Sequence, residues 1–367
     1  MQVIDIDSHS RPRPRDYSVA PEYSHLKPLT FVDARGNIRT TFDDKEILTI
    51  TAGERAIANK KSKPNRTEAY YDASVRYQHI KEAGIDVQYV SAGTVAEFNY
   101  VDGKIGASFW RAFNTFLYEA FMKPYPETFI GVPQLPLQDI GEAIKELERC
   151  VKEYGMRTFI MPSNWNGIDF ADRHWWNFYD RVRELGIRGI LLHVKSTAAH
   201  SPWVGKERLA ALGPDGTMGR RILSHPFEYA TNIVNLIFGG MMDCFPEFRF
   251  AFLEAGAEFA INLKHRIEEN LDQVAYLQDK LTQSLDKYFD HFYFFVDDLL
   301  LAQNGKRLLL AMEEFGAEHL FFGTDYPHED SSLEGYAKIT ELTSISPAIK
   351  EKILGGNALT LFGEPLR

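Results

Sequence analysis

The stretch that decides the fold is Val3-Ile4-Asp5-Ile6-Asp7-Ser8-His9, close to the start of the chain. Apolar residues alternate here with acidic ones, and this period of two predicts a short β-strand. Alternate residues of a strand point to the same side, so Asp7 and His9 should project together from its carboxyl end. The strand is the first unit of a pattern that continues along the chain.

Beyond residue 66, segments with helical spacing alternate with short apolar runs that are predicted strands. About eight strands separated by helices indicate parallel βαβ units closed into a (β/α)8 TIM barrel. After the first strand, the predicted strands cover residues 87–91, 129–132, 158–161, 189–193, 249–254, 292–296 and 319–323. The predicted helices cover residues 68–83, 107–121, 140–154, 175–185, 226–242, 257–270 and 307–315, with closing helices after the last strand.

An open doubly wound sheet is the alternative architecture for this alternation. No predicted strand is followed by a glycine-rich phosphate loop of the G-x-G-x-x-G or G-x-x-x-x-G-K type, which disfavours that alternative. We therefore predict one α/β domain over residues 1–367. It would carry an extended insertion over residues 11–66, interpreted as a lid or binding loop, and a helical insertion over residues 273–288, before the seventh strand.

The composition excludes several classes of function. The 367 residues are 44% hydrophobic and 25% charged, as is usual for a globular protein. The net charge of −10 opposes binding to nucleic acid or to an anionic membrane. No apolar run approaches the ~20 residues of a membrane-spanning helix. Because there are only two cysteines and no signal-peptide pattern, we expect a cytoplasmic protein without a disulfide framework.

Polar residues at strand ends are the candidate functional groups, because barrel enzymes place their chemistry there. His193 ends the run Gly189 to Leu192, Glu254 ends the run Phe250 to Leu253, and Asp325 follows the last strand. Singly, an aspartate can cap a turn and a histidine can belong to the core. Their joint placement with Asp7 and His9 favours a metal site. Two imidazoles and two carboxylates suit zinc, manganese or iron(II).

At this point the sequence resembles a known family. It looks like the amidohydrolase-related branch of the amidohydrolase superfamily, which includes aminocarboxymuconate semialdehyde decarboxylase and the resorcylate and carboxyvanillate decarboxylases. The resemblance covers essentially the whole chain. It rests on Asp7-x-His9, His193, Phe252-Leu253-Glu254-Ala255-Gly256, Phe322-Gly323-Thr324-Asp325-Tyr326-Pro327-His328 and the terminal Gly356-Asn357-Ala358-x-x-x-Leu361-Phe362-Gly363.

The resemblance implies a mononuclear site with one divalent metal ion, zinc before manganese or iron. Its ligands would be Asp7, His9, His193 and Asp325. Many members carry His-x-His on the first strand, so Asp7 makes this shell more anionic. The predicted fourth strand is followed by no lysine. The carbamylated bridge of binuclear relatives therefore has no candidate here.

A second departure concerns the catalytic residues, for which we single out Asp325, Glu254 and His225. Several decarboxylases of the family place a histidine where this chain has Glu254. A carboxyl group transfers protons near neutrality only if burial or a neighbouring charge raises its pKa. His225, placed before the helix predicted from Pro226, is the alternative imidazole, although a structural role at a helix start is an equal interpretation. Asp325 would bind the ion and also accept a proton.

The family suggests a non-oxidative decarboxylase, a C–C lyase, acting on an aromatic or unsaturated carboxylic acid. The alternative is a hydrolase of an amide, ester, lactone or C–C bond that uses a metal-bound water. A non-catalytic barrel is a third class, which four strand-end ligands disfavour.

The expected partner is a small-molecule substrate, an anionic or aromatic acid. An acidic protein needs local cations to bind it, and loop aromatics can stack on it. A homodimer through residues 110–121 or 273–288 is compatible with the apolar faces of those segments. The candidate substrate-binding residues are Arg11, Arg13, Lys195, Trp165 and His328.

Overall fold

The structure is a computed structural model that divides into two compact units. The N-terminal unit comprises Gln2–Met156 and Thr324–Tyr336, and the C-terminal unit comprises Arg157–Gly323 and Ala337–Glu364. The prediction of a single domain stays a prediction. The residues described are 2–26, 28–35, 38–42, 45–50, 66–93, 96–99, 101–194, 217–296, 298–328, 331 and 333–363.

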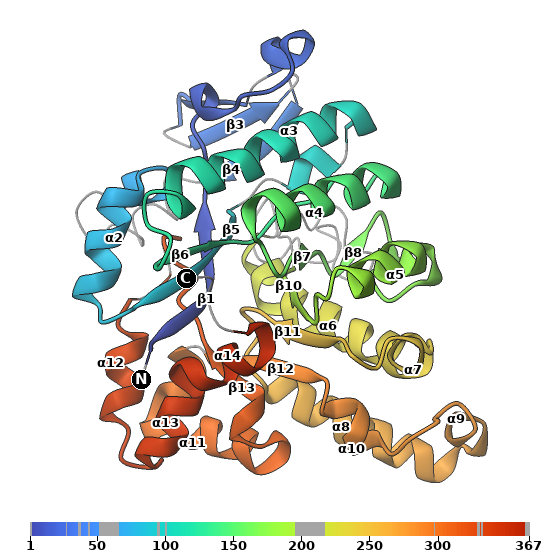
Figure 1. The fold of residues 1–367 in the computed structure, drawn as a ribbon. Coiled ribbons are helices and arrows are strands. Elements are labelled where there is room, and N and C mark those ends of the chain that lie inside the picture. The colour runs from blue at the N-terminus through green and yellow to red at the C-terminus, as the bar shows by residue number, and fades with distance from the viewer. Residues whose placement is uncertain are drawn as a thin grey trace. The chain divides into compact units, whose positions relative to one another are not determined.

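The N-terminal unit contains a parallel three-stranded sheet in the order β1-β5-β6 (Figure 1). All three strands lie at or close to predicted positions, and β1 continues beyond Asp7 through His9. Its strands are β1 (Ile4–Ser10), β5 (Val87–Ala92) and β6 (Phe129–Gly131). Its helices are α2 (Ala73–Glu82), α3 (Gly103–Phe116) and α4 (Ile140–Tyr154), with the π-helix η5 (Leu117–Met122) and the 3-10 turns η3 (Glu68–Tyr70) and η4 (Ala96–Asn99).

Aspartate caps define where the helices of this unit begin. Asp72, Asp102 and Asp139 each accept hydrogen bonds from backbone N–H groups in the first turn of α2, α3 and α4. Such side chains satisfy donors that have no partner within the helix. At the other end of α4, Gly155 takes a left-handed conformation with φ of 69°. Glycine adopts this conformation without steric cost, so the helix ends there.

Part of the insertion expected over residues 11–66 forms regular structure. An antiparallel sheet in the order β2-β3-β4 lies within it, which the sequence analysis did not predict. Phe42 joins this sheet to α3, since its ring centroid lies 4.8 Å from that of Phe109. The role of the insertion as a lid stays a prediction. The elements are η1 (Pro14–Asp16), η2 (Pro21–Leu26), β2 (Leu29–Val32), β3 (Ile38–Phe42) and β4 (Lys45–Ile50).

The C-terminal unit contains a parallel five-stranded sheet in the order β13-β12-β11-β10-β7 (Figure 1). Together with the three strands of the other unit, the described residues contain the eight parallel strands that the sequence predicts. Phenylalanine rings dominate the core of this unit, and those of Phe252 and Phe294 stack at 5.8 Å. The strands are β7 (Ile160–Met161), β10 (Gly189–Leu192), β11 (Arg249–Phe252), β12 (Phe292–Val296) and β13 (Leu320–Phe322).

Helices follow the strands of this unit as predicted, and a small hairpin of β8 (Asn164–Trp165) and β9 (Ile168–Asp169) follows β7. Among the described residues, no helix combines the length and apolar character needed to cross a membrane. The helices are η6 (Arg173–Trp175), α5 (Trp176–Glu184), α6 (Thr217–Phe238), α7 (Met241–Cys244), α8 (Glu258–Gln273), α9 (Ala275–Gln278), α10 (Leu285–Phe289), α11 (Asp298–Phe315) and η9 (Ala317–His319). The closing helices are α12 (Gly335–Glu341), α13 (Pro347–Glu351), η10 (Lys352–Gly356) and α14 (Asn357–Phe362).

Among the helix boundaries that differ from prediction, those of α6 and α11 differ most. The sequence predicts a helix that begins at Pro226. Helix α6 instead begins at Thr217 and continues through Pro226, so His225 lies inside a helix rather than before one. The helix predicted over residues 307–315 is the second part of α11, which is interrupted by non-helical backbone at 302–305.

The last helix packs directly against β10. Gly189, the first residue of β10, has no side chain, and the ring of Phe362 occupies the space beside it. A Cβ atom built at Gly189 would lie 2.6 Å from Phe362 Cε1 and 3.1 Å from Leu361 Cγ. The close approach of α14 therefore depends on glycine at this position.

We expect Gly189→Ala to lower the free energy of unfolding by about 1–3 kcal/mol, because the added methyl group overpacks the contact with α14. The matched control is Gly103→Ala, where the nearest atom to an added Cβ is Asp139 Cβ at 3.6 Å, an ordinary contact. Urea unfolding of both variants is the measurement. Equal losses of stability in the two variants would contradict the packing role of Gly189.

Candidate metal centre

Asp7, His9 and Asp325 lie together in the N-terminal unit. The backbone N–H of Asp325 donates to the carbonyl of Asp7 at 2.9 Å, and that of His9 donates to the carbonyl of Tyr326 at 2.7 Å. The segment around Asp325 therefore runs parallel to β1. Across this pairing, His9 Nε2 lies 2.9 Å from Asp325 Oδ1 and 3.4 Å from Asp7 Oδ1.

These separations fit a shared cation. Ligand atoms about 2.0–2.2 Å from one ion, in tetrahedral or octahedral arrangement, lie about 2.8–3.6 Å apart. The three side chains are an imidazole and two carboxylates, which are ligands for zinc or manganese. Asp7 and His9 are almost completely buried, and a carboxylate is unfavourable in such surroundings unless a cation or donors compensate its charge.

His328 extends this cluster. Its Nδ1 lies 2.5 Å from Asp325 Oδ1, and its ring centroid lies 4.3 Å from that of His9. Arg66 fixes the backbone of this segment, because its guanidinium donates to the carbonyls of Pro327, His328 and Ser331. The sequence analysis assigned His328 to the substrate and did not foresee its contact with Asp325.

A buried polar network binds the backbone segments that carry this cluster. Asp5 accepts hydrogen bonds from Thr324 N, Thr324 Oγ1 and Gln88 Nε2, and burial raises its pKa to about 6. Gln88 in turn accepts from Arg76 Nε at 2.8 Å. Arg76 Nη1 donates to the carbonyl of His9 at 2.5 Å, and Nη2 donates to that of Tyr326 at 3.0 Å. One guanidinium thus holds both segments that carry the cluster.

Burial lowers the pKa of Arg76 to about 10, so the side chain remains charged at neutral pH. Its guanidinium donates to Gln88 and to backbone carbonyls, including those of His9 and Tyr326. The residue is therefore placed to organise the backbone of β1.

His193, Glu254 and His225 form a second cluster, in the C-terminal unit. His193 and Glu254 follow the neighbouring strands β10 and β11, whose residues Leu192 and Phe252 are register partners. His193 Nε2 lies 2.7 Å from Glu254 Oε1, and His225 Nε2 lies 3.3 Å from Glu254 Oε2. Glu254 therefore lies between two imidazoles.

Tyr229 of α6 aligns the two strand ends. Its hydroxyl oxygen lies 2.7 Å from the Leu192 carbonyl and 2.9 Å from the Leu253 carbonyl, and it accepts from Val194 N at 3.1 Å. Because Tyr229 lies one helical turn after His225, the same helix that fixes the strand ends also carries the second imidazole to Glu254.

The hydrogen bonds of His193 indicate which of its two ring nitrogens carries hydrogen. Nδ1 lies 3.0 Å from the Val194 carbonyl, which can only accept, so Nδ1 carries hydrogen. In a neutral imidazole, Nε2 then presents a lone pair toward the carboxylate of Glu254. Two lone pairs at 2.7 Å repel each other unless a proton or a cation lies between them. This arrangement is typical of a metal-ligating histidine oriented by a backbone carbonyl.

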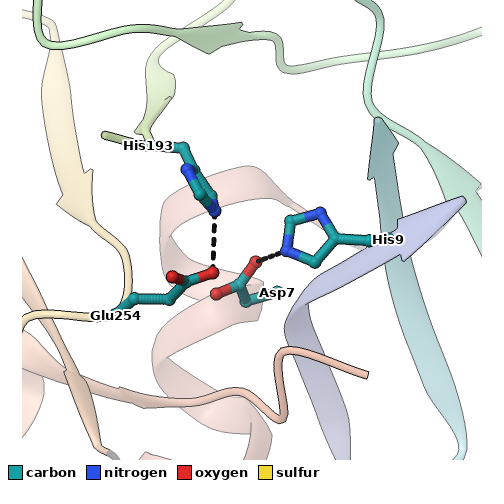
Figure 2. Close-up of side chains that lie close together, drawn as sticks. All are labelled: Asp7, His9, His193 and Glu254. Carbon is teal, nitrogen blue, oxygen red and sulfur yellow. Dashed lines mark hydrogen bonds and ion pairs between the residues drawn. The ribbon is translucent and has the colours of Figure 1, made fainter. Parts of the chain in front are cut away.

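Figure 2 shows one contact from each cluster: Asp7 with His9, and His193 with Glu254. All four residues offer ligand atoms of the kinds that hold metal ions. Two strand-end carboxylates also share a backbone feature, since Glu254 has φ of 60° and Asp325 has φ of 56°. Residues other than glycine rarely adopt this left-handed conformation, and such residues concentrate at functional sites.

The remaining predicted substrate-binding residues have different surroundings. Arg11 lies over the ring of Tyr70 at 4.6 Å. Arg13 instead pairs with Asp16, with Nε 2.9 Å from Oδ2 and Nη2 3.1 Å from Oδ1. In the C-terminal unit, Trp165 stacks near His174 with ring centroids 6.4 Å apart. Lys195 lies outside the described residues.

Parallel strands that end in imidazole and carboxylate groups define the class, an α/β protein with candidate metal ligands at its strand ends. The amidohydrolase family model matches residues 6–363, and the chain belongs to that family. This confirms the resemblance seen in the sequence.

Two relatives of known activity match most of the chain. The 2-amino-3-carboxymuconate-6-semialdehyde decarboxylase of Dictyostelium discoideum is 26% identical over 298 residues, which are 80% of this chain and 77% of that protein. The gamma-resorcylate decarboxylase of Polaromonas sp. strain JS666 is 27% identical over 298 residues, which are 78% of this chain and 86% of that protein.

A solved structure shows the fold. The dihydroxybenzoic acid decarboxylase from Polaromonas sp. JS666, crystallised with manganese and the inhibitor 2-nitroresorcinol, matches with a TM-score of 0.68 at 20% identity. The match covers 98% of this chain and 96% of that one. The chain has the amidohydrolase barrel fold, so the predicted (β/α)8 class is confirmed.

We expect Arg76→Met to lower the free energy of unfolding by about 3 kcal/mol or more, because the buried carbonyls of His9 and Tyr326 and the side-chain oxygen of Gln88 would each lose a charged donor. The measurement is the urea midpoint of the metal-free protein. Lys123→Met, which removes an exposed cation paired with Glu119, is the control and should leave the midpoint unchanged. A midpoint for Arg76→Met equal to that of the control would disprove the anchoring role.

Proposed function

We propose that this protein is a mononuclear metal-dependent decarboxylase that removes carbon dioxide from an aromatic or unsaturated carboxylic acid without an oxidant. The observation that carries the proposal is the pair of strand-end clusters, with Asp7, His9 and Asp325 in one unit and His193 in the other. The family, whose model spans both units, supports joining them into one site. The activities of the Dictyostelium and Polaromonas relatives support decarboxylation.

We propose Asp7, His9, His193 and Asp325 as the ligands of one divalent ion. Zinc is our first expectation, and manganese is the alternative that the manganese-bound Polaromonas decarboxylase supports. When bound, the ion supplies an electrophile that neutralises charge on substrate oxygens. Glu254 offers a further carboxylate beside His193, so a ligand role for Glu254 competes with the proton-transfer role inferred from sequence.

In this proposal, protein side chains donate and accept the protons that the reaction requires. Loss of carbon dioxide leaves an electron pair on carbon, and this carbon needs a proton from a positioned acid. In our proposal Glu254 delivers that proton, and His225, 3.3 Å from its second oxygen, replenishes it. Asp325 is paired with His328 and serves as the proton acceptor for a substrate hydroxyl. Trp165 remains a candidate for stacking on a planar substrate.

We expect His193→Ala to lose the bound metal while the barrel stays folded, because the residue is a ligand at a strand end and not part of the core. Elemental analysis should fall from about one equivalent of metal to a small fraction of it, with an unchanged circular dichroism spectrum. The control is His265→Ala, which removes a side chain that is 59% exposed on α8. Full metal content in His193→Ala would exclude this residue as a ligand.

The function itself is tested by carbon dioxide release from a panel of hydroxybenzoates and muconate-type acids. We expect release that disappears on chelation and returns with zinc or manganese. In deuterium oxide, the product should carry deuterium at the carbon that lost carbon dioxide. Turnover of esters or lactones with no carbon dioxide from any acid would instead establish the hydrolase alternative.

A further inference from the structure

A serine hydroxyl lies beside the imidazole of His9, at the ring nitrogen that does not face the carboxylates. Ser91 of β5 is the register partner of His9 of β1, so the two side chains project from the same face of the sheet. Ser91 Oγ lies 3.0 Å from His9 Nδ1, and both side chains are buried. Figure 2 shows this nitrogen directed away from Asp7, which faces Nε2. The two nitrogens of the imidazole therefore meet different chemical groups.

Gly93, two positions after Ser91, leaves space for the same imidazole. A Cβ atom built at Gly93 would lie 3.0 Å from His9 Cβ and 3.4 Å from His328 Nε2. The backbone N–H of Gly93 donates to the Ser10 carbonyl at 2.9 Å, which continues the pairing with β1 past His9. The chain of β5 and its continuation thus contacts His9 with a hydroxyl at one position and leaves out a side chain at the next but one. The position of the ring is set from this neighbouring strand as well as from β1.

His9 and His193 differ in the group that faces Nδ1. The Val194 carbonyl beside His193 can only accept, which fixes hydrogen on Nδ1 of that ring. A serine hydroxyl can donate or accept, so Ser91 can form a hydrogen bond with either tautomer of His9. On the other side of the ring, Nε2 of His9 lies 2.9 Å from Asp325 Oδ1, and an ionised carboxylate can only accept. A neutral His9 that bonds to Asp325 therefore has hydrogen on Nε2 and a lone pair on Nδ1.

We propose that Ser91 is a positioning residue for metal binding, and that its hydroxyl reverses its hydrogen-bonding role when His9 becomes a ligand. In the metal-free protein the Ser91 hydroxyl donates to Nδ1, while Nε2 donates to Asp325. With a cation at Nε2, hydrogen resides on Nδ1 and Ser91 Oγ accepts it. The neutral ring loses one hydrogen at Nε2 and gains one at Nδ1, so its proton count does not change. This inference rests on the proposed function, in which His9 is a ligand.

The hydroxyl contributes to metal affinity without touching the ion. An imidazole that is bonded at Nδ1 is held in one orientation, so less rotational freedom is lost when Nε2 binds a cation. Removing the hydrogen-bond partner of a metal-ligating histidine typically weakens metal binding by about 10-fold to 100-fold. Because Ser91 can bond to both tautomers, it holds the ring before the ion arrives as well as afterwards. Val194 can do this for only one tautomer of His193.

The first test measures the zinc dissociation constant of the full chain by competition with a chelator of known affinity. We expect Ser91→Ala to weaken zinc binding by about 10-fold or more, because Nδ1 of His9 loses its partner. Ser91→Thr keeps a hydroxyl and should retain the wild-type affinity within about 3-fold. The matched control is Ser8→Ala, since Ser8 Oγ donates to the Tyr89 carbonyl at 2.6 Å and so bonds the same two strands through a carbonyl instead of an imidazole. This control should change the affinity by less than about 2-fold.

The tautomer of His9 is a readout that a purely structural role of Ser91 would not change. Long-range proton–nitrogen correlation spectra of protein with isotopically labelled histidine distinguish hydrogen on Nδ1 from hydrogen on Nε2. The His9 signals are assigned by their absence from His9→Asn. We expect hydrogen on Nε2 in the metal-free wild type and on Nδ1 with zinc bound. In zinc-bound Ser91→Ala the Nδ1 proton should shift upfield, because it has lost its hydrogen bond, whereas Ser8→Ala should leave it unchanged.

The inference is overturned by wild-type zinc affinity in Ser91→Ala, by an equal loss of affinity in Ser8→Ala, or by hydrogen on Nδ1 of His9 both with and without zinc. Circular dichroism and urea midpoints of each variant separate weaker binding from misfolding, and the tautomers are measured on the wild type even if Ser91→Ala does not fold. Zinc affinity that His9→Asn leaves unchanged would refute the ligand role of His9 and this inference together. Absence of carbon dioxide release would refute the proposed decarboxylase alone, because zinc binding is measured without turnover.

Discussion

The candidate site depends first on the pairing of β1 with the segment that carries Asp325. These two stretches are more than 300 positions apart in the chain, yet the backbone bonds from Asp325 to Asp7 and from His9 to Tyr326 set their register. A slip of one residue would turn His9 away, because side chains alternate along a strand. Arg76 and Asp5 bond to both stretches from the buried side, so the register is fixed by charged groups as well as by the ladder.

In the C-terminal unit, too, the positions of the candidate residues depend on how two strands are aligned. There the strands β10 and β11 are neighbours in one sheet, and the hydroxyl of Tyr229 fixes their ends. In this unit the unprotonated Nε2 of a neutral His193 would face the carboxylate of Glu254. Both groups are hydrogen-bond acceptors, so they would repel each other. A proton or a cation between the two groups would remove this repulsion. The Val194 carbonyl accepts from Nδ1 of His193, which leaves Nε2 as the atom that can bind either one. The proposal that His193 is a metal ligand is therefore supported by its hydrogen bonding, and not only by the residue types.

Much of this could be predicted from the sequence because it follows from local patterns. The helix over residues 140–154 has an aspartate cap and a glycine stop, and its observed bounds match the predicted ones. Strand-end placement and the family resemblance grouped Asp7, His9, His193 and Asp325 as candidate ligands, and the structure brings Asp7, His9 and Asp325 together. Other features had no local signal. The ring contact between His9 and His328 and the contacts of Arg76 join residues far apart in sequence, and α6 continues through Pro226, where the predicted helix began. The sheet β2-β3-β4 was missed because its strands lie in a stretch rich in charge and proline.

A carboxyl group such as that of Glu254, the proposed acid, depends on its surroundings more than an imidazole does. An imidazole can hold and release a proton near neutrality without help, whereas a carboxyl group needs surroundings that disfavour its charged form. Such surroundings require that His193 carries no proton on Nε2, because a protonated His193 at 2.7 Å would stabilise the charged carboxylate of Glu254. In the proposed site, a metal ion held by His193 would take the place of that proton, and His225 would be the imidazole that exchanges one with Glu254. In this proposal, metal ligation and proton delivery would be coupled through Glu254, whose carboxylate lies between the two imidazoles.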